Sequence, residues 1–127
     1  MTKKILIVED TKDALDNLKD LLGLEGFEIS TAVNGQDALH KLYLYMPDLI
    51  ITDLRMPKMD GFAFIETLKQ SEEFKSIPVV VFSANATPEN EKKSLEMGAI
   101  KFLKKPSAIE LILSTIHEAL SLGTIAG

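Results

Sequence analysis

The sequence predicts a single α/β domain built on a doubly wound, five-stranded parallel sheet. Three observations lead to this fold class. Short runs rich in Val and Ile alternate with segments of helical periodicity, in units of about 20–25 residues. These runs are apolar at nearly every position, as strands covered on both faces are. The chain has 127 residues, 46% of them hydrophobic, which is enough for one domain with its own core.

The elements follow from periodicity and from the residues that interrupt it. The strands are predicted at the apolar runs, which occupy residues 5–8, 27–32, 49–52, 79–82 and 100–103. Four helices are predicted where apolar residues recur every three or four positions, within residues 14–22, 38–46, 64–68 and 109–120, and a fifth, at residues 88–97, is predicted from the capping residues that flank it. Right-handed crossovers between such strands give a sheet of the flavodoxin-like kind, with strand order 2-1-3-4-5.

Turn residues bound the second helix, and the domain is expected to end shortly before the C-terminus. Asn34-Gly35 predicts a turn before this helix, and Pro47 closes it after Met46. We expect the domain to span residues 1–122 and a frayed tail to occupy residues 123–127.

Capping residues bound the last two helices. Thr87-Pro88 predicts an N-cap followed by proline at the first helical position, and Gly98 is expected just past the end of that helix. Ser107 and Glu110 have the spacing of a capping box at the start of the final helix.

Composition excludes several classes of protein. The absence of cysteine excludes disulfides, thiolate metal sites and thiol catalysis, and indicates a reducing compartment. No apolar run approaches the ~20 residues of a membrane span, and the start of the chain becomes polar too early for a signal peptide. With 14 basic against 19 acidic side chains, the net charge of −5 disfavours contact with nucleic acid or anionic lipid. We therefore expect a cytoplasmic protein with no membrane partner and no direct nucleic-acid partner.

Polar and charged residues follow the ends of four predicted strands. Glu9 and Asp10 end the first strand, Asp53 the third and Ser83 the fourth, and Lys105 follows the fifth. Strands one and three are neighbours in the predicted order, so we expect the three carboxylates within a few Å of each other at the edge where ligands bind. Protonation or a bound cation relieves their repulsion. Oxygen-only ligands suit Mg²⁺.

This set of side chains indicates phosphoryl chemistry. The ammonium of Lys105, the hydroxyl of Ser83 and a cation surround a carboxylate, Asp53, that can act as a nucleophile and form an aspartyl phosphate. Each residue alone has a plainer interpretation: Asp10 can cap the first helix, Ser83 can be a loop hydroxyl and Lys105 a solvated surface charge. The functional interpretation depends on their joint placement at four strand ends.

Four segments in order, covering residues 3 to about 121, resemble the receiver domain of bacterial two-component response regulators. The matching segments are residues 5–10, 47–61, 78–84 and 98–106. The resemblance implies a single-domain, chemotaxis-regulator-like signalling phosphoprotein of a phosphorelay. It implies a switch rather than an enzyme, one that catalyses only its own phosphotransfer and slow dephosphorylation.

The resemblance also implies a role for each residue of the site. Asp53 is the phosphoacceptor, and Lys105 binds the phosphoryl group. Asp10, Asp53 and the backbone carbonyl of Arg55 ligate Mg²⁺, and Glu9 supports the metal through a water molecule.

Switching is assigned to a second set of residues by the same resemblance. Ser83 and Phe102 match the switch positions, although Thr and Tyr are common there, and Lys105-Pro106 matches a peptide bond that is cis in the family. Phe102 lacks a phenolic hydroxyl, so its part in switching must rest on ring packing. The helix at residues 88–97 has few apolar residues and is expected to be the most weakly docked.

The implied partners are a histidine kinase or phosphotransfer protein and an unknown downstream protein target. Three alternatives remain open. A haloacid-dehalogenase-like phosphatase would carry its nucleophile on the first strand, with a second acid two residues later. A flavodoxin would need a Ser/Thr/Gly-rich phosphate loop where residues 9–13 are mainly acidic. The chain can also be the receiver of a larger kinase or transcription factor.

Overall fold

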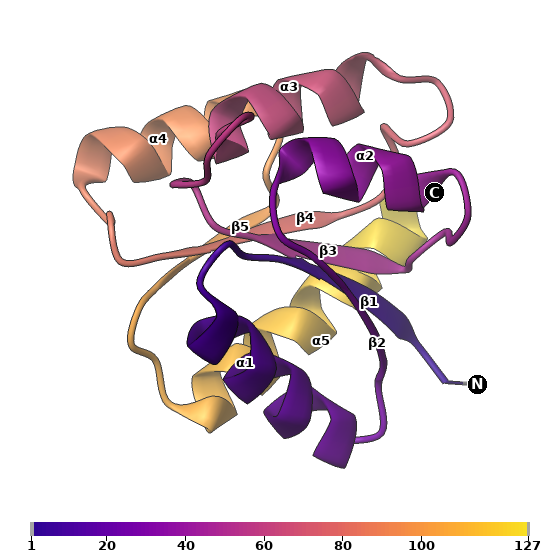
Figure 1. Ribbon diagram of the computed structural model, residues 1–127, viewed down its shortest axis with the longest axis vertical. Helices are drawn as coiled ribbons and strands as arrows, with labels where there is room; N and C mark the ends of the chain where they lie inside the picture. The colour runs from indigo at the N-terminus through magenta and orange to yellow at the C-terminus, as the bar shows by residue number, and fades with distance from the viewer. Residues whose placement is uncertain (1, 127) are drawn as a thin grey trace.

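The computed structural model describes residues 2–126, and within them five helices alternate with five strands (Figure 1). The strands are β1 (Lys4–Val8), β2 (Glu28–Ala32), β3 (Leu49–Thr52), β4 (Val79–Ser83) and β5 (Lys101–Lys104). The helices are α1 (Lys12–Leu24), α2 (Gly35–Leu42), α3 (Gly61–Gln70), α4 (Pro88–Met97) and α5 (Ile109–Ala126). All strand pairs are parallel, in the order β2-β1-β3-β4-β5. The predicted fold class and strand order are confirmed.

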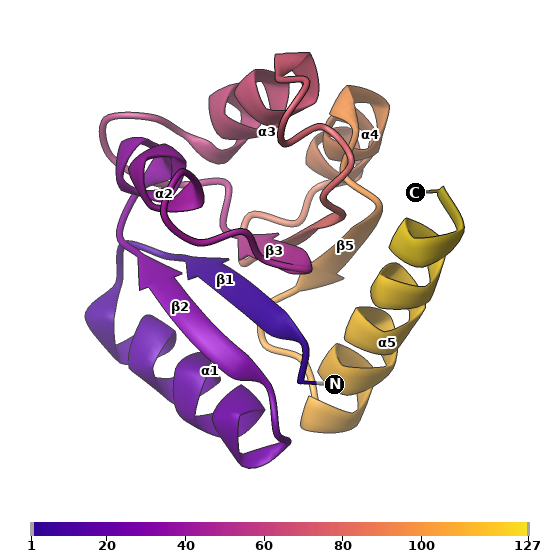
Figure 2. The same ribbon diagram turned by 90° about the vertical axis from the view of Figure 1, so that its right-hand side faces the viewer.

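Helices cover both faces of the sheet, which is why its three central strands β1, β3 and β4 are largely apolar. Helices α2, α3 and α4 lie on one face and α1 and α5 on the other (Figures 1 and 2). Successive side chains of a strand point to opposite faces. Leu6 and Val8 of β1 therefore join the core under α2, α3 and α4, whereas Ile5 and Ile7 join the core under α1 and α5. Among the described residues, each helix is too short or too polar to pass through a lipid bilayer.

Two of the three predicted helix starts differ from expectation. Thr87 caps α4 as predicted, since its Oγ1 accepts from the backbone N–H of Asn90 at 3.1 Å. Asn34 is the N-cap of α2 rather than part of a separate turn, because its side chain accepts a helical N–H and the helix begins at the next residue. The capping box at Ser107 does not form. The Ser107 hydroxyl instead donates to the carbonyl of Lys104, and α5 begins at Ile109.

The ends of two helices test the remaining boundaries. Gly98 ends α4 with a φ of 122°, a conformation that favours glycine, as predicted. The expected end of α2 at Met46 is wrong, because the helix stops at Leu42. Met46 precedes Pro47, which disfavours helical backbone at the residue before it. The helix α5 continues to Ala126, whereas Gly127 lies outside the described residues. The domain limit at 122 and the frayed tail at 123–127 stay predictions.

The first residue of α3, Gly61, packs directly on the backbone of Asp53 and Leu54. A Cβ on Gly61 would lie 2.4 Å from the carbonyl oxygen of Asp53 and 2.7 Å from Cα of Leu54. The N–H of Gly61 also donates to the Leu54 carbonyl at 2.9 Å. Glycine at this position therefore lets α3 hold the chain segment that follows β3.

We expect Gly61→Ala to lower the free energy of unfolding by about 1–3 kcal/mol, because the added methyl must displace backbone. Gly23→Ala is the matched control. Gly23 lies in the last turn of α1, with nothing within 4 Å of an added Cβ, so alanine there should raise stability by about 0.5 kcal/mol. Urea denaturation of the three proteins measures both effects. Equal midpoints for Gly61→Ala and the wild type would contradict the close approach.

Candidate functional site

Strand pairing brings the predicted site residues to one edge of the sheet. In the parallel pair β1 and β3, Val8 lies opposite Thr52, and the N–H of Asp53 donates to the Val8 carbonyl at 3.1 Å. At the other side of the site, the N–H of Lys105 donates to the carbonyl of Ser83 at 3.0 Å, just beyond the β4–β5 pairing. The carboxyl ends of β1, β3, β4 and β5 thus converge.

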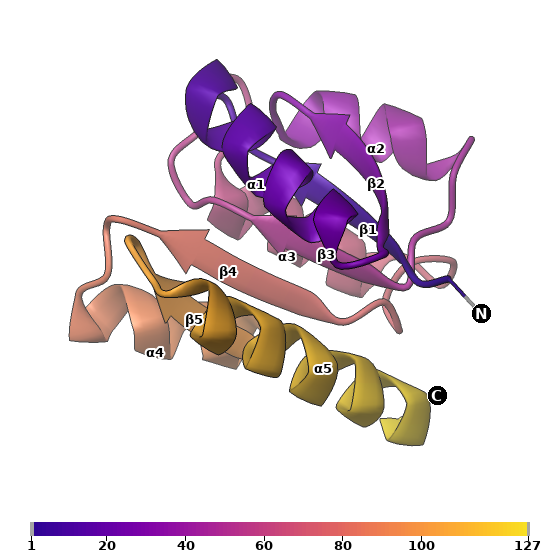
Figure 3. The same cartoon turned by 90° about the horizontal axis from the view of Figure 1, so that it is seen from below.

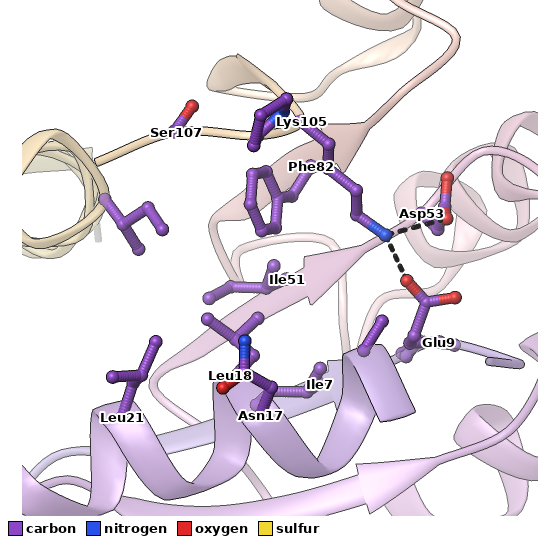
Figure 4. Close-up of a pocket in the computed structure, with 14 residues that line it drawn as sticks. Ile7, Glu9, Asn17, Leu18, Leu21, Ile51, Asp53, Phe82, Lys105 and Ser107 are labelled. Atoms are coloured by element: carbon purple, nitrogen blue, oxygen red, sulfur yellow. Dashed lines mark hydrogen bonds and ion pairs between the residues drawn. The ribbon is translucent and has the colours of Figure 1, made fainter. Parts of the chain in front are cut away.

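The ammonium of Lys105 bridges two carboxylates at this edge. Its Nζ donates to Oε1 of Glu9 and lies 3.1 Å from Oδ2 of Asp53, as Figure 4 shows. The side chains of Glu9, Asp53 and Lys105 are only 6%, 13% and 22% exposed, so these charges interact with little screening by water. The structure therefore brings together three of the predicted site residues in one ion-pair network.

Backbone N–H groups hold the remaining carboxylate oxygens. Oδ1 of Asp53 accepts from Leu54 at 2.6 Å and from Arg55 at 3.3 Å, and Oε2 of Glu9 accepts from Thr11 at 3.2 Å. These donors were not identified from the sequence, because they depend on the loop backbone rather than on residue type. Together with Lys105 they fix the orientation of both carboxylates.

Burial and pairing act in opposite directions on the acid–base equilibria of the pair. Burial raises the pKa of Glu9, and the hydrogen bond from Lys105 counteracts only part of that rise. Burial alone would lower the pKa of Lys105, but the hydrogen bond to Glu9 and the nearby charge of Asp53 outweigh it and raise that pKa. Lys105 therefore stays protonated and is the counter-charge on which the buried Glu9 depends.

An apolar cavity of about 220 Å³ lies beside this network, between α1 and α5. Figure 3 looks onto this face of the sheet, and Figure 4 shows the cavity itself. Leu18 and Leu21 of α1, Ile51 of β3 and Phe82 of β4 line its apolar part, and Lys105 lies along its upper wall. The ammonium is 5.4 Å from the centre of the Phe82 ring. Apolar groups thus replace water on one side of the Lys105 side chain, which accounts for its low exposure.

The expected cluster of three carboxylates does not form. Within the described part of the chain, no three Asp, Glu, His or Cys side chains come together closely enough to hold a metal ion. Asp10 is exposed and lines a separate open groove with Arg55 and Asn85. The reason is that the Lys105 ammonium already balances Glu9 and Asp53, whereas Asp10 begins the loop and faces the solvent. The expectation of three adjacent carboxylates is therefore wrong. Lys105 bridges Glu9 and Asp53, and Asp10 lines the separate open groove.

Of the two predicted switch residues, Ser83 is hydrogen-bonded to the loop backbone and Phe102 packs against the core. Ser83 is 1% exposed, and its Oγ accepts from the backbone N–H of Asn85 at 3.1 Å. Phe102 of β5 is partly buried and packs against the core under α2, α3 and α4. The Lys105-Pro106 peptide is cis, as the resemblance implied.

We expect Lys105→Met to destabilise the protein by about 1–3 kcal/mol at pH 7.5, because Glu9 is left buried and unpaired. Its pKa then rises further. An acid with a higher pKa in the folded than in the unfolded state loses folding stability as the pH rises through that interval. The deficit relative to the wild type should therefore shrink as the pH falls from 7.5 to 5.

Thermal or urea unfolding across this pH range measures the effect. Lys104→Met, at the exposed neighbouring position, is the control and should show no such dependence. The double variant Glu9→Gln/Lys105→Met should recover stability at pH 7.5. A deficit that is constant with pH would remove Glu9 from the explanation.

Comparison with known proteins agrees with this geometry. The response regulator receiver domain family matches residues 5–117. The transcriptional regulatory protein PrrA of Mycobacterium leprae is 33% identical over 117 residues, which cover 92% of this chain and 49% of PrrA. The polar-differentiation response regulator DivK of Brucella ovis is 31% identical over 120 residues, 94% of this chain and 98% of DivK. The chain thus spans about half the length of PrrA and nearly all of DivK.

A solved structure agrees with both the fold and the sequence. The signal receiver domain of a signal transduction histidine kinase from Syntrophus aciditrophicus superposes with a TM-score of 0.87 at 37% identity, covering 94% of this chain and 91% of that one. The family match spans nearly the whole chain, and its strand ends carry the expected acidic residues and lysine. The chain therefore belongs to the receiver domains of two-component response regulators.

Proposed function

We propose that Asp53 accepts a phosphoryl group from a phosphohistidine of a histidine kinase or phosphotransfer protein, with Mg²⁺, and that this modification switches a protein–protein interaction surface. The observation that carries the proposal is the arrangement of Asp53 itself. Its carboxylate lies at the carboxyl edge of the sheet, oriented by two backbone N–H groups on one oxygen and by Lys105 on the other. A carboxylate held in this way is a positioned nucleophile.

The transfer step balances without any further reactant. A carboxylate oxygen of Asp53 forms a bond to phosphorus while the phosphorus–nitrogen bond of the donor breaks; the electron pair of that bond stays on the nitrogen, and a donor protonated on its other ring nitrogen leaves as neutral imidazole. Negative charge gathers on the phosphoryl oxygens during transfer. The ammonium of Lys105, 3.1 Å from Oδ2 of Asp53, is placed to stabilise that charge.

The residues around Asp53 fit a hard divalent cation. Asp10 and Arg55 line the open groove, and the Arg55 N–H bonds the Asp53 carboxylate. The carboxylates of Asp10 and Asp53 and the Arg55 carbonyl are all oxygen donors, which Mg²⁺ prefers. Glu9 is engaged by Lys105 and by Thr11, so it would support the metal only through water. When bound, Mg²⁺ supplies positive charge that offsets the phosphoryl oxygens.

Modification of Asp53 introduces a charge of about −1.5 to −2 and new acceptor oxygens. Ser83 is the nearest hydroxyl on the neighbouring strand end, and it can donate a hydrogen bond to a phosphoryl oxygen. Its Oγ is now bonded to the N–H of Asn85, so this movement alters the loop before α4. Phe102 of β5 can then repack, and the changed surface meets a downstream protein.

We expect acetyl phosphate with Mg²⁺ to add one phosphoryl group to the wild-type protein, seen by mass spectrometry and removed by hydroxylamine as acyl phosphates are. Asp53→Asn should abolish the addition, because the amide is not a nucleophile of this kind. Asp60→Asn is the matched control: this residue lines the groove but caps α3, and asparagine caps equally well. A label that survives hydroxylamine, or one found in Asp53→Asn, would place the modification elsewhere.

We expect Asp10→Asn to weaken Mg²⁺ binding by roughly tenfold, because one of two ligand charges is lost. Titration of the folded protein with Mg²⁺, followed by NMR shifts, measures the affinity. Chelation of the metal should likewise prevent labelling by acetyl phosphate. Asp13→Asn, an exposed change in the first turn of α1, is the control and should leave the affinity unchanged. An equal affinity in Asp10→Asn would remove Asp10 from the metal site.

A further inference from the structure

The loop between β4 and α4 is held by a side chain of α4 that the proposed function does not use. Nδ2 of Asn90 donates to the backbone carbonyl of Asn85 at 2.9 Å. The N–H of Asn85 donates to Oγ of Ser83 at 3.1 Å, and Oγ of Ser94 donates to the carbonyl of Asn90 at 2.7 Å. Hydrogen bonds therefore link Ser83, at the end of β4, through Asn85 and Asn90 to the middle of α4.

These bonds matter because α4 has little apolar anchorage. The buried residue of α4 is a serine, Ser94. Leu95 is 43% exposed, while Met97 is only partly buried against the core. Helix α4 therefore buries fewer apolar side chains than α3, which buries Phe64 and Leu68, and the hydrogen bond from Asn90 is one of the contacts that hold its first turn to the preceding loop.

The position of the loop also bears on the site. Asn85 is partly buried and lines the open groove together with Asp10 and Arg55. In this arrangement the N–H of Asn85 donates a hydrogen bond to Oγ of Ser83. Displacement of the Ser83 side chain toward a phosphoryl group on Asp53 would move Oγ away from the Asn85 N–H or draw Asn85 with it, and Asn90 holds the carbonyl of Asn85 in place from the other side.

We propose that Asn90 is a positioning residue that stabilises the resting arrangement of residues 84–87 and thereby opposes the movement of Ser83 toward modified Asp53. The second half of this proposal rests on the proposed function, whereas the first half does not. The amide of Asn90 donates to the loop, and its backbone N–H is separately bonded to Thr87. The side-chain link and the helix cap can therefore be removed independently.

The first measurement is amide exchange of the unmodified proteins, which does not depend on phosphorylation. Asn90→Asp keeps the shape of the side chain but removes the donor to Asn85. We expect faster exchange across residues 84–87 in Asn90→Asp and in Asn90→Ala, with exchange in α1 and α3 unchanged. Glu91→Ala, at the exposed next position, is the matched control and should behave as the wild type. Unchanged exchange across 84–87 in both Asn90 variants would overturn the proposal.

The second measurement is the affinity for beryllofluoride with Mg²⁺, a mimic of the phosphoryl group on Asp53. If Asn90 favours the resting arrangement, its loss should tighten apparent binding by about three- to tenfold, the effect of one hydrogen bond. Thr87→Ala weakens the start of α4 but leaves the Asn90–Asn85 bond in place, so it should not tighten binding. Unchanged or weaker binding in the Asn90 variants, or equal tightening in Thr87→Ala, would overturn the proposal.

The two measurements separate this proposal from the proposed function. Failure of the wild-type protein to bind beryllofluoride would contradict the role of Asp53 and of Mg²⁺. The exchange data would still decide whether Asn90 holds the loop.

Discussion

The ion pair of Lys105 with Glu9 and Asp53 is the interaction on which the site depends. Two largely buried carboxylates at adjacent strand ends repel each other, and the ammonium of Lys105 between them offsets that repulsion. That charge comes from the loop after β5, at the far side of β4 from Asp53. Parallel pairing of all these strands is needed to bring the three side chains together. The long-range order of the sheet is therefore a requirement of the site's electrostatics as well as of the core.

The sequence predicted those features that follow from strand periodicity and parallel topology. Residues 5–8 and 49–52 are apolar at every position but Thr52, so they could be identified as central strands, and the meeting of Glu9, Asp53 and Lys105 followed from the strand order. The conformation of the loops was harder to predict from the sequence. The outward direction of Asp10 and the engagement of Ser107 by the Lys104 carbonyl depend on backbone turns in which several local hydrogen bonds compete.

Two helices on the same face of the sheet, α3 and α4, differ in how firmly they are held near the site. Helix α3 starts against the backbone of Asp53 and buries large apolar side chains, so its position is tied to that residue by close packing. Helix α4 follows the strand that carries Ser83; its buried residue is Ser94, and the Asn90 amide bonds its first turn to the loop before it. A local change at the site therefore meets the least resistance at α4.

The kind of contact that holds a helix decides how a small movement at the site reaches that helix. Apolar contacts weaken gradually as surfaces slide, whereas a hydrogen bond is lost when its atoms separate or misalign by a modest amount. Asn90 donates to the Asn85 carbonyl and the Asn85 N–H donates to Ser83, so the two bonds are arranged in series and displacement of the Ser83 Oγ removes a discrete constraint on the loop. Under the proposed function, loss or retention of these hydrogen bonds would distinguish the modified arrangement of the loop from the resting one.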